Sequence, residues 1–306
     1  MNPFLKFVLK LLSSPRIDVE EDYESIRRFH QLFSLKSKKG YKILDYQLFS
    51  ADHSHEIPIR VFYPEKLEKQ EAILFYHGGG WVVGDIETYT HTCINMANKL
   101  GRVVYSVDYR LAPEYPYPAG LEDCYRVAEL LFEKKGIPRQ FKPEKFILMG
   151  DSAGGNLAAA VSLMLRDKGM KLPDKQVLWY PVTHWDHTKN SPFKSVEENG
   201  YDYGLTAKRV ESYMELYAPE EELRRTPYIS PLMAPNLRNQ PETFIITAEF
   251  DPLRDEGEAY AKALQESGNK AQFHRVEESP HGFITYPENH PFLEEVYPLI
   301  KDFLDA

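Results

Sequence analysis

The sequence predicts an α/β fold with a mostly parallel sheet and helices on both of its faces. From residue 72 onward, short apolar runs of strand length alternate with segments of helix length. Strands in a covered parallel sheet are buried on both faces, so they form near-continuous apolar runs. The chain has 306 residues, 42% of them hydrophobic, which is enough for one large domain of this kind. We therefore expect a single domain over residues 1–306.

The elements can be placed in order along the chain. Two strand-like runs, 41–49 and 57–64, flank the polar segment SADHSHE and predict an antiparallel hairpin. Further strands are expected at 72–77, 102–109, 145–150, 176–181, 242–250 and 271–278. Helices are expected at 88–100, 119–135, 156–168, 255–267 and 291–304. Residues 182–241 break this alternation, contain a helix near 206–217, and indicate an insertion over the sheet.

The first 40 residues are expected to be helical. In MNPFLKFVLKLLSSPR, lysines interrupt the apolar run and no small-residue cleavage site follows, which favours an amphipathic helix over a signal peptide. Such a helix is too short and interrupted to span a bilayer, and we expect no stable membrane insertion. Helical spacing places an apolar set on one face, which we expect to pack against the body of the protein: Phe4, Leu5, Val8, Leu11 and Leu12. In the next helix, the spacing places Ile26, Phe29, Phe33 and His30 on one face.

Charge and cysteine content narrow the functional class. The formal net charge of -9 argues against nucleic-acid binding and against attraction to anionic membranes. Cys93 and Cys124 lack the spacing of a disulfide framework or a metal site, so we expect reduced, buried thiols in a cytoplasmic protein. A homo-oligomer is compatible with the sequence.

A candidate nucleophile stands at the end of one predicted strand. The run KFILMGDSAGGN places Ser152 in the pattern G-x-S-x-G, between an apolar strand and a helix. A turn this tight needs small flanking residues, here Gly150, Ala153 and Gly154, and it presents the hydroxyl above the sheet. The alternative is a serine that only caps a helix.

A serine nucleophile needs a base and an acid that orients the base. Asp251 follows the predicted strand 242–250, and His281 follows the strand 271–278, so both should lie at the same edge of the sheet as Ser152. Asp255 is a weaker choice of acid because it lies inside the next predicted helix.

The stretch HGGGWVVGD, residues 77–85, places three glycines directly after a predicted strand. A dinucleotide loop would need glycine where Val83 stands, and a phosphate loop would need lysine where Asp85 stands. An oxyanion hole fits better, with backbone N–H groups of Gly79, Gly80 and Ala153 as donors and Gly78 as an alternative. We expect His77 to brace this loop.

Five motifs now stand in order: HGGGW (77–81), DYRLAPE (108–114), GDSAGGN (150–156), DPLRDE (251–256) and HGF (281–283). With them the chain resembles the bacterial hormone-sensitive-lipase-like esterases, a branch of the α/β-hydrolase fold, over about residues 40–306. The resemblance implies a carboxylesterase for short- to medium-chain esters, a triad of Ser152, Asp251 and His281, and no cofactor or metal. It also implies a helical cap from about 1–40 and 183–223 over a core of about 41–182 and 224–306.

Other activities on the same scaffold stay open at this point. An amidase, a lactonase or a sugar-ester deacetylase would use the same triad. A catalytically inactive ligand-binding protein is also known on this family scaffold, although such proteins lose the histidine that His281 represents here.

Several residues have weaker predicted roles. Asp108 and Arg110 are expected to form a charge pair that braces a loop. The pairs His53 with His55 and His184 with His187 carry ligand-type side chains, but we favour a solvated turn for the first and no metal for the second. The residues that could line a substrate pocket are Trp81, Tyr180, Leu205 and Phe283.

Overall fold

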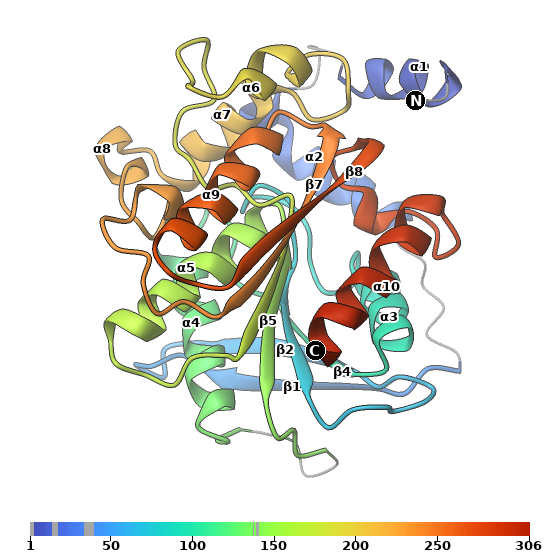
Figure 1. Ribbon diagram of the computed structural model, residues 1–306, viewed down its shortest axis with the longest axis vertical. Helices are drawn as coiled ribbons and strands as arrows, with labels where there is room; N and C mark the ends of the chain where they lie inside the picture. Colours follow the sequence, from blue (N-terminus) through green and yellow to red (C-terminus); the bar gives the residue numbers. More distant parts are fainter. Residues whose placement is uncertain (1–2, 14–17, 34–39, 137, 139–140) are drawn as a thin grey trace.

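A computed structural model describes residues 3–13, 18–33, 40–136, 138 and 141–306 of the protein, and a twisted sheet runs through its centre (Figure 1). The strands of the described residues are β1 (Ile43–Phe49), β2 (Glu56–Phe62), β3 (Ala72–Tyr76), β4 (Val103–Val107), β5 (Phe146–Asp151), β6 (Lys175–Trp179), β7 (Glu242–Phe250) and β8 (Ala271–Pro280). Their order across the sheet is β1-β2-β4-β3-β5-β6-β7-β8. Strand β2 pairs antiparallel with both β1 and β4. All other neighbours in the sheet, from β4 through β3, β5, β6 and β7 to β8, pair parallel. The α/β prediction is confirmed.

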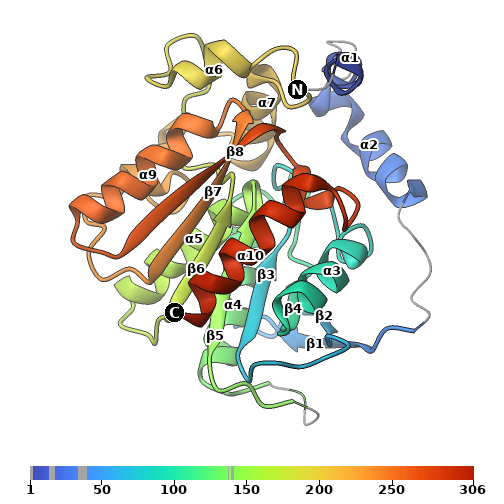
Figure 2. The same cartoon turned by 45° about the vertical axis from the view of Figure 1, so that its right-hand side comes forward.

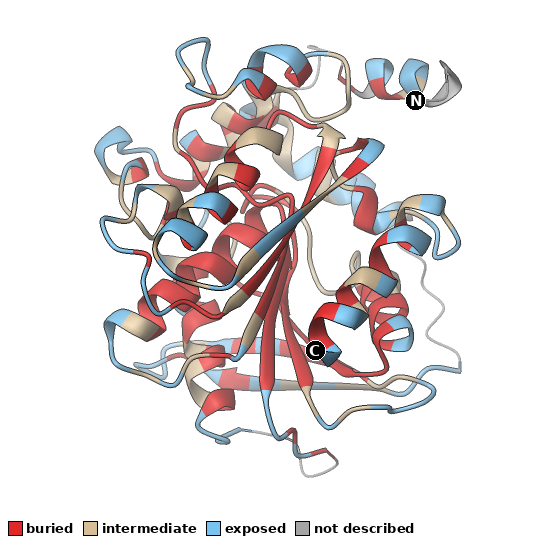
Figure 3. Ribbon diagram, in the orientation of Figure 1, coloured by how far each residue is buried: buried red, intermediate tan, exposed pale blue. Residues whose placement is uncertain are grey.

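Helices cover both faces of the sheet (Figure 2). On one face lie α3 (Thr90–Leu100) and α10 (Pro291–Asp305), and on the other lie α4 (Ala119–Phe132), α5 (Ala153–Asp167) and α9 (Arg254–Glu266). Because each face of the sheet is covered, every residue of β3, β4 and β5 is buried, as Figure 3 shows for the central strands. Two apolar cores result, one on each side of the sheet.

Further helices gather beyond the carboxyl ends of the strands. They are α1 (Pro3–Leu12), α2 (Val19–Phe33), α6 (Lys194–Asn199) and α7 (Ala207–Tyr217). Figures 1 and 2 both show them at the end of the molecule toward which β7 and β8 point. Segments from the chain's start and its middle therefore meet there, with α2 packed on α7 and α6 on α9. The remaining short helices are α8 (Glu221–Arg224), η1 (Pro231–Met233) and η2 (Phe283–Thr285).

The inward face of α1 differs from the predicted one. Leu9 is buried, whereas the side chain of Leu11, expected to face inward, is 60% exposed. The reason is the neighbour that α1 meets: Leu9 contacts Gly204, and Lys10 pairs with Asp202 on the same loop. The side chains of four predicted face residues are not among those that the structure describes: Phe4, Leu5, Leu12 and Phe33.

The residues that helical spacing places on one face of α2 have different surroundings. Phe29 is 58% exposed, while Ile26 packs against the core. Arg27 is the side chain that reaches inward, and it donates to the carbonyl oxygens of Val82 and Ala112. The loops beneath α2 present carbonyl groups, which a guanidinium satisfies and a phenyl ring cannot.

The predicted pair of Asp108 and Arg110 does not form. Arg110 pairs instead with Asp123 in the first turns of α4, with 2.9 Å between Nε and Oδ2. Asp123 also accepts from His55 at 2.8 Å, so His55 does not lie in a fully solvated turn as predicted. Asp108 accepts from the N–H of Ile86. Spacing along the chain could not reveal that β4 and the hairpin both approach α4.

Candidate active site

Three strand ends bring together the three side chains that the sequence singled out. Ser152 directly follows β5, Asp251 directly follows β7, and His281 directly follows β8. Strands β5 to β8 are neighbours in the sheet and parallel, so their carboxyl ends lie at one edge.

Ser152 occupies a strained turn between β5 and α5. Its φ and ψ angles are 56° and -120°, a conformation that costs a non-glycine residue about 1–3 kcal/mol. The flanking glycines make the turn sterically feasible. A Cβ on Gly150 would lie 2.2 Å from the carbonyl oxygen of Gly154, and one on Gly154 would lie 2.0 Å from that of Tyr76. The sequence therefore folds into a turn that presents the hydroxyl of Ser152 at the edge of the sheet.

A chain of hydrogen bonds joins the three side chains. The Nε2 atom of His281 lies 2.9 Å from Oγ of Ser152, and its Nδ1 lies 2.6 Å from Oδ2 of Asp251. Asp251 is fully buried, and its Oδ1 accepts from the N–H of Leu253. Because a carboxylate accepts only, Nδ1 carries the proton and Nε2 is free to accept from the serine hydroxyl. The ring of Tyr180 packs 4.6 Å from the imidazole and limits its rotation.

The glycine loop lies beside the serine, in conformations that favour glycine. Gly79 has φ 122° and Gly80 has φ 60°. The N–H of Gly78 donates to Oδ1 of Asp151 at 2.8 Å, so it is already engaged. Among the described residues, no hydrogen bond uses the N–H of Gly79, Gly80 or Ala153. This difference favours Gly79 and Gly80 over Gly78 as donors to a bound anion.

Comparisons with known proteins identify the family of the chain. A family model of the alpha/beta hydrolase fold matches residues 73–285. An arylesterase of Saccharolobus solfataricus is 37% identical over 76% of this chain and 74% of its own length. Esterase LipI of Mycobacterium tuberculosis is 32% identical over 91% of this chain and 87% of its own length. An esterase structure from Pyrobaculum calidifontis superposes with a TM-score of 0.86 at 34% identity, covering 100% of both chains.

The chain belongs to the hormone-sensitive-lipase-like esterases of the α/β-hydrolase fold. As a member of this family it is a serine carboxylic ester hydrolase. Among the described residues, no helix combines the length and the apolar composition needed to traverse a bilayer.

Asp151 is a residue of this esterase whose role sequence reasoning missed. It is buried, and its carboxylate accepts from the Tyr89 hydroxyl at 2.9 Å as well as from Gly78. Burial raises the pKa of Asp151 to about 6, although the hydrogen bonds from Tyr89 and Gly78 partly oppose this rise. Asp151 thus ties the glycine loop to the strand that carries Ser152. The signal in the sequence was an acidic residue between the buried strand and the serine.

His77 braces the esterase's glycine loop, as the sequence suggested. Its ring is fully buried and stacks on Tyr109, with 4.4 Å between centroids. Nδ1 donates to the carbonyl oxygen of Gly78 at 2.8 Å. Burial lowers the pKa of His77 to about 4, so the imidazole is neutral at neutral pH. A neutral, enclosed imidazole fits a structural role better than proton transfer.

A cavity of about 180 Å³ adjoins Ser152 and His281. Trp81 and Leu205, both expected in a substrate pocket, are among its lining residues. Tyr180 and Phe283 are fully buried in the core and are not in that lining. The wall also includes Val210, Tyr213 and His30. Helices α2 and α7 therefore complete a cavity whose floor comes from the strand ends.

Proposed function

We propose that the esterase works through a triad in which Ser152 is the nucleophile, His281 the base and Asp251 the group that orients the base. One observation carries this proposal: Nε2 of His281 lies 2.9 Å from Oγ of Ser152 while the buried Asp251 accepts from Nδ1 at 2.6 Å. A serine hydroxyl is a weak nucleophile until a base removes its proton, and this arrangement provides that base.

In the first half of the proposed reaction, Oγ of Ser152 attacks the ester carbonyl carbon and Nε2 of His281 takes the hydroxyl proton. The carbonyl oxygen becomes an oxyanion, which accepts hydrogen bonds from the N–H groups of Gly79, Gly80 and Ala153. The tetrahedral intermediate then expels the alcohol, which leaves with the proton from His281. An acyl group stays bonded to Ser152.

In the second half, water attacks the acyl carbon while His281 accepts a proton from it. A second oxyanion forms at the same N–H groups. Collapse of this intermediate returns the proton to Oγ of Ser152 and releases the carboxylic acid. Asp251 holds the imidazole in one tautomer and stabilises the imidazolium that forms in each half.

We propose short- to medium-chain acyl esters as substrates, because the cavity beside Ser152 has a volume of only about 180 Å³. We also propose that residues 1–40 and 183–223 form a cap over a catalytic core of about 41–182 and 224–306. Leu205, Val210 and Tyr213 support this division, because they line the cavity from the inserted segment.

The proposed mechanism is tested by the variant Ser152→Ala. We expect the wild type to hydrolyse p-nitrophenyl acetate and to react covalently with a fluorophosphonate probe. The variant should do neither while keeping the circular dichroism spectrum of the wild type. Turnover retained in Ser152→Ala would rule out this serine as nucleophile.

Matched substrates distinguish the alternatives on the same triad. Anilides, lactones and acetylated sugars, each assayed beside an ester of the same acyl group, separate an amidase, a lactonase and a sugar-ester deacetylase from a general carboxylesterase. An inactive binding protein would give neither turnover nor labelling by the probe.

We further propose a cytoplasmic location, because Cys93 and Cys124 are buried and unpaired, as thiols in a reducing compartment are. Cell fractionation with an antibody against the protein tests this. The homo-oligomer stays a prediction, which size-exclusion chromatography with light scattering checks.

A further inference from the structure

The inserted segment 183–199 contacts the loop that carries Asp251. We call residues 251–256 the acid loop. The side-chain amide of Asn199 donates to the carbonyl oxygen of Asp251 at 3.3 Å. The hydroxyl of Ser195 donates to the carbonyl oxygen of Pro252 at 2.7 Å, and the backbone N–H of Ser195 donates to the carboxylate of Asp255 at 2.9 Å. The acid loop is thus hydrogen-bonded along its length to a segment that the mechanism leaves without a role.

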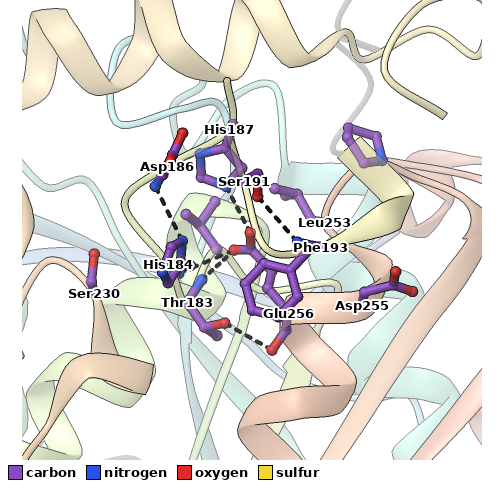
Figure 4. Close-up of polar contacts among 12 residues, drawn as sticks. Thr183, His184, Asp186, His187, Ser191, Phe193, Ser230, Leu253, Asp255 and Glu256 are labelled. Carbon is purple, nitrogen blue, oxygen red and sulfur yellow. Dashed lines mark hydrogen bonds and ion pairs between the residues drawn. The ribbon is translucent and has the colours of Figure 1, made fainter. Parts of the chain in front are cut away.

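Glu256 is the last residue of the acid loop, and its carboxylate contacts three residues of the inserted segment: Thr183, His184 and His187. Its side chain is fully buried in the first turn of α9. Oε1 accepts from the backbone N–H of Thr183 at 2.6 Å and of His184 at 3.2 Å. Oε2 lies 2.7 Å from Nε2 of His187, whose side chain is also fully buried (Figure 4). An ion pair excluded from water therefore joins the inserted segment to the acid loop.

His187 lies between two carboxylates. Its backbone N–H donates to Glu211 on α7, and its Nδ1 lies 3.6 Å from Oε1 of the same residue, just beyond hydrogen-bond distance. Burial alone lowers the pKa of His187, but Glu256 and Glu211 outweigh that effect and raise it to about 10. The nearby imidazole of His184 has a lowered pKa, chiefly through burial. His187 is therefore the cation of this cluster at neutral pH.

The physical consequence of losing His187 follows from burial. A carboxylate out of water is tolerated only while a cation and hydrogen bonds compensate it, and removing one partner leaves an uncompensated charge. Glu256 would then draw water toward itself or move outward. That movement would displace Asp251, because the same inserted segment holds its backbone through Asn199.

We propose that His187 is a positioning residue for Asp251: its ion pair with Glu256 fixes segment 183–199 on the acid loop and so holds the carboxylate that orients His281. This inference rests on the proposed catalytic role of Asp251. It gives His187, which the sequence had paired with His184 as a weak metal-site candidate, a role other than metal binding.

The test compares the hydrolysis of p-nitrophenyl acetate by the wild type, His187→Gln, a double variant and a control variant. In His187→Gln we expect kcat to fall about 10- to 100-fold, the effect of a slight misplacement of a catalytic group, with KM unchanged. In the double variant His187→Gln with Glu256→Gln, no buried charge is left and the two amides can hydrogen-bond to each other in place of the ion pair, so we expect most of kcat to return. Such rescue would not follow if His187 only filled space.

Arg102→Gln is the matched control. The fully buried Arg102 pairs with Glu71 at 2.9 Å and Asp305 at 2.6 Å, just before β4 and hence at the opposite end of the strands. We expect this variant to lose stability but to keep the kcat of the wild type. An equal fall of kcat in Arg102→Gln and His187→Gln would overturn the inference, because it would then reflect general destabilisation. Unchanged kcat in a folded His187→Gln would overturn it too.

A milder variant keeps the inference testable if His187→Gln does not fold. Ser195→Ala removes a hydroxyl that donates to the carbonyl oxygen of Pro252 and accepts from the N–H of Asp255. We expect kcat to fall about 2- to 10-fold for each neutral hydrogen bond lost. Unchanged kcat there would contradict the inference. Turnover by the wild type but not by Ser152→Ala upholds the proposed function whatever these variants do. No turnover by the wild type would overturn the proposed function and the inference together.

Discussion

Replacing Gly79 by alanine tests whether its N–H stabilises the oxyanion. At φ 122°, a Cβ on Gly79 would lie 2.0 Å from the carbonyl oxygen of Val83. Real Cβ atoms do not approach a neighbour closer than 3.0 Å, so the backbone must move by about 1 Å. No flexible side chain can absorb this movement, because the clashing atom belongs to the backbone.

A displacement of about 1 Å is enough to lose a hydrogen bond to the transition state. Loss of one oxyanion donor costs about 10²–10³ in kcat, or about 3–4 kcal/mol. The N–H of Gly79 makes a weaker hydrogen bond to the carbonyl oxygen of the bound ester than to the oxyanion, so we expect KM to change little. Initial rates of p-nitrophenyl acetate hydrolysis over a range of substrate concentrations give both constants.

Gly169→Ala provides a control for the cost of alanine in a left-handed conformation. Gly169 has φ 64°, two residues after the end of α5, and no atom lies within 4 Å of the position its Cβ would take. We expect a loss of about 1 kcal/mol in stability and an unchanged kcat. If Gly79→Ala retained a kcat within a few-fold of this control, Gly79 could not be an oxyanion donor.

Three further outcomes are expected. Asp251→Asn should lower kcat by up to about 10⁴, because the amide can donate to Nδ1 and favour the wrong tautomer of His281, and steady-state rates measure this loss. Tyr213→Ala should shift the preferred acyl length upward, because the ring lines the cavity and lies against Gly80, and a series from acetyl to decanoyl p-nitrophenyl esters would show no shift if the ring were irrelevant. The raised pKa of His187 gives stability that is fully present below its ordinary value of 6.5 and is lost as pH rises toward about 10. Urea unfolding should therefore show the wild type losing more free energy of unfolding between pH 7 and pH 10 than His187→Gln does.

The sequence was sufficient for the fold because its signals are local and repeated. Apolar runs such as AILFYH and KFILMG mark strands that are buried on both faces, and a parallel sheet places all their carboxyl ends at one edge. Once Ser152, Asp251 and His281 were each found after such a run, their meeting followed from topology. The site was therefore predictable wherever a residue's role depends on its position relative to a strand end.

Roles that depend on partners distant in the chain were not predictable. Helical spacing gave α1 an apolar face, yet the choice of Leu9 over Leu11 depended on the loop around Gly204. The partner of Arg110 is Asp123 rather than Asp108, because the side chain turns toward α4. Both contacts depend on how separate elements pack, which the spacing of residues does not record.

The sequence by itself determined the α/β architecture, the order of the three site residues and the glycine loop, because each depends on a short segment and on its place relative to a strand end. Only the tertiary structure decided that Gly78 is engaged by Asp151, and that His187 neutralises Glu256. Burial and charge act through space at a few ångströms, and the residues that share such a space lie tens of positions apart in the chain. A buried charge can therefore be assigned a partner only once the chain is folded.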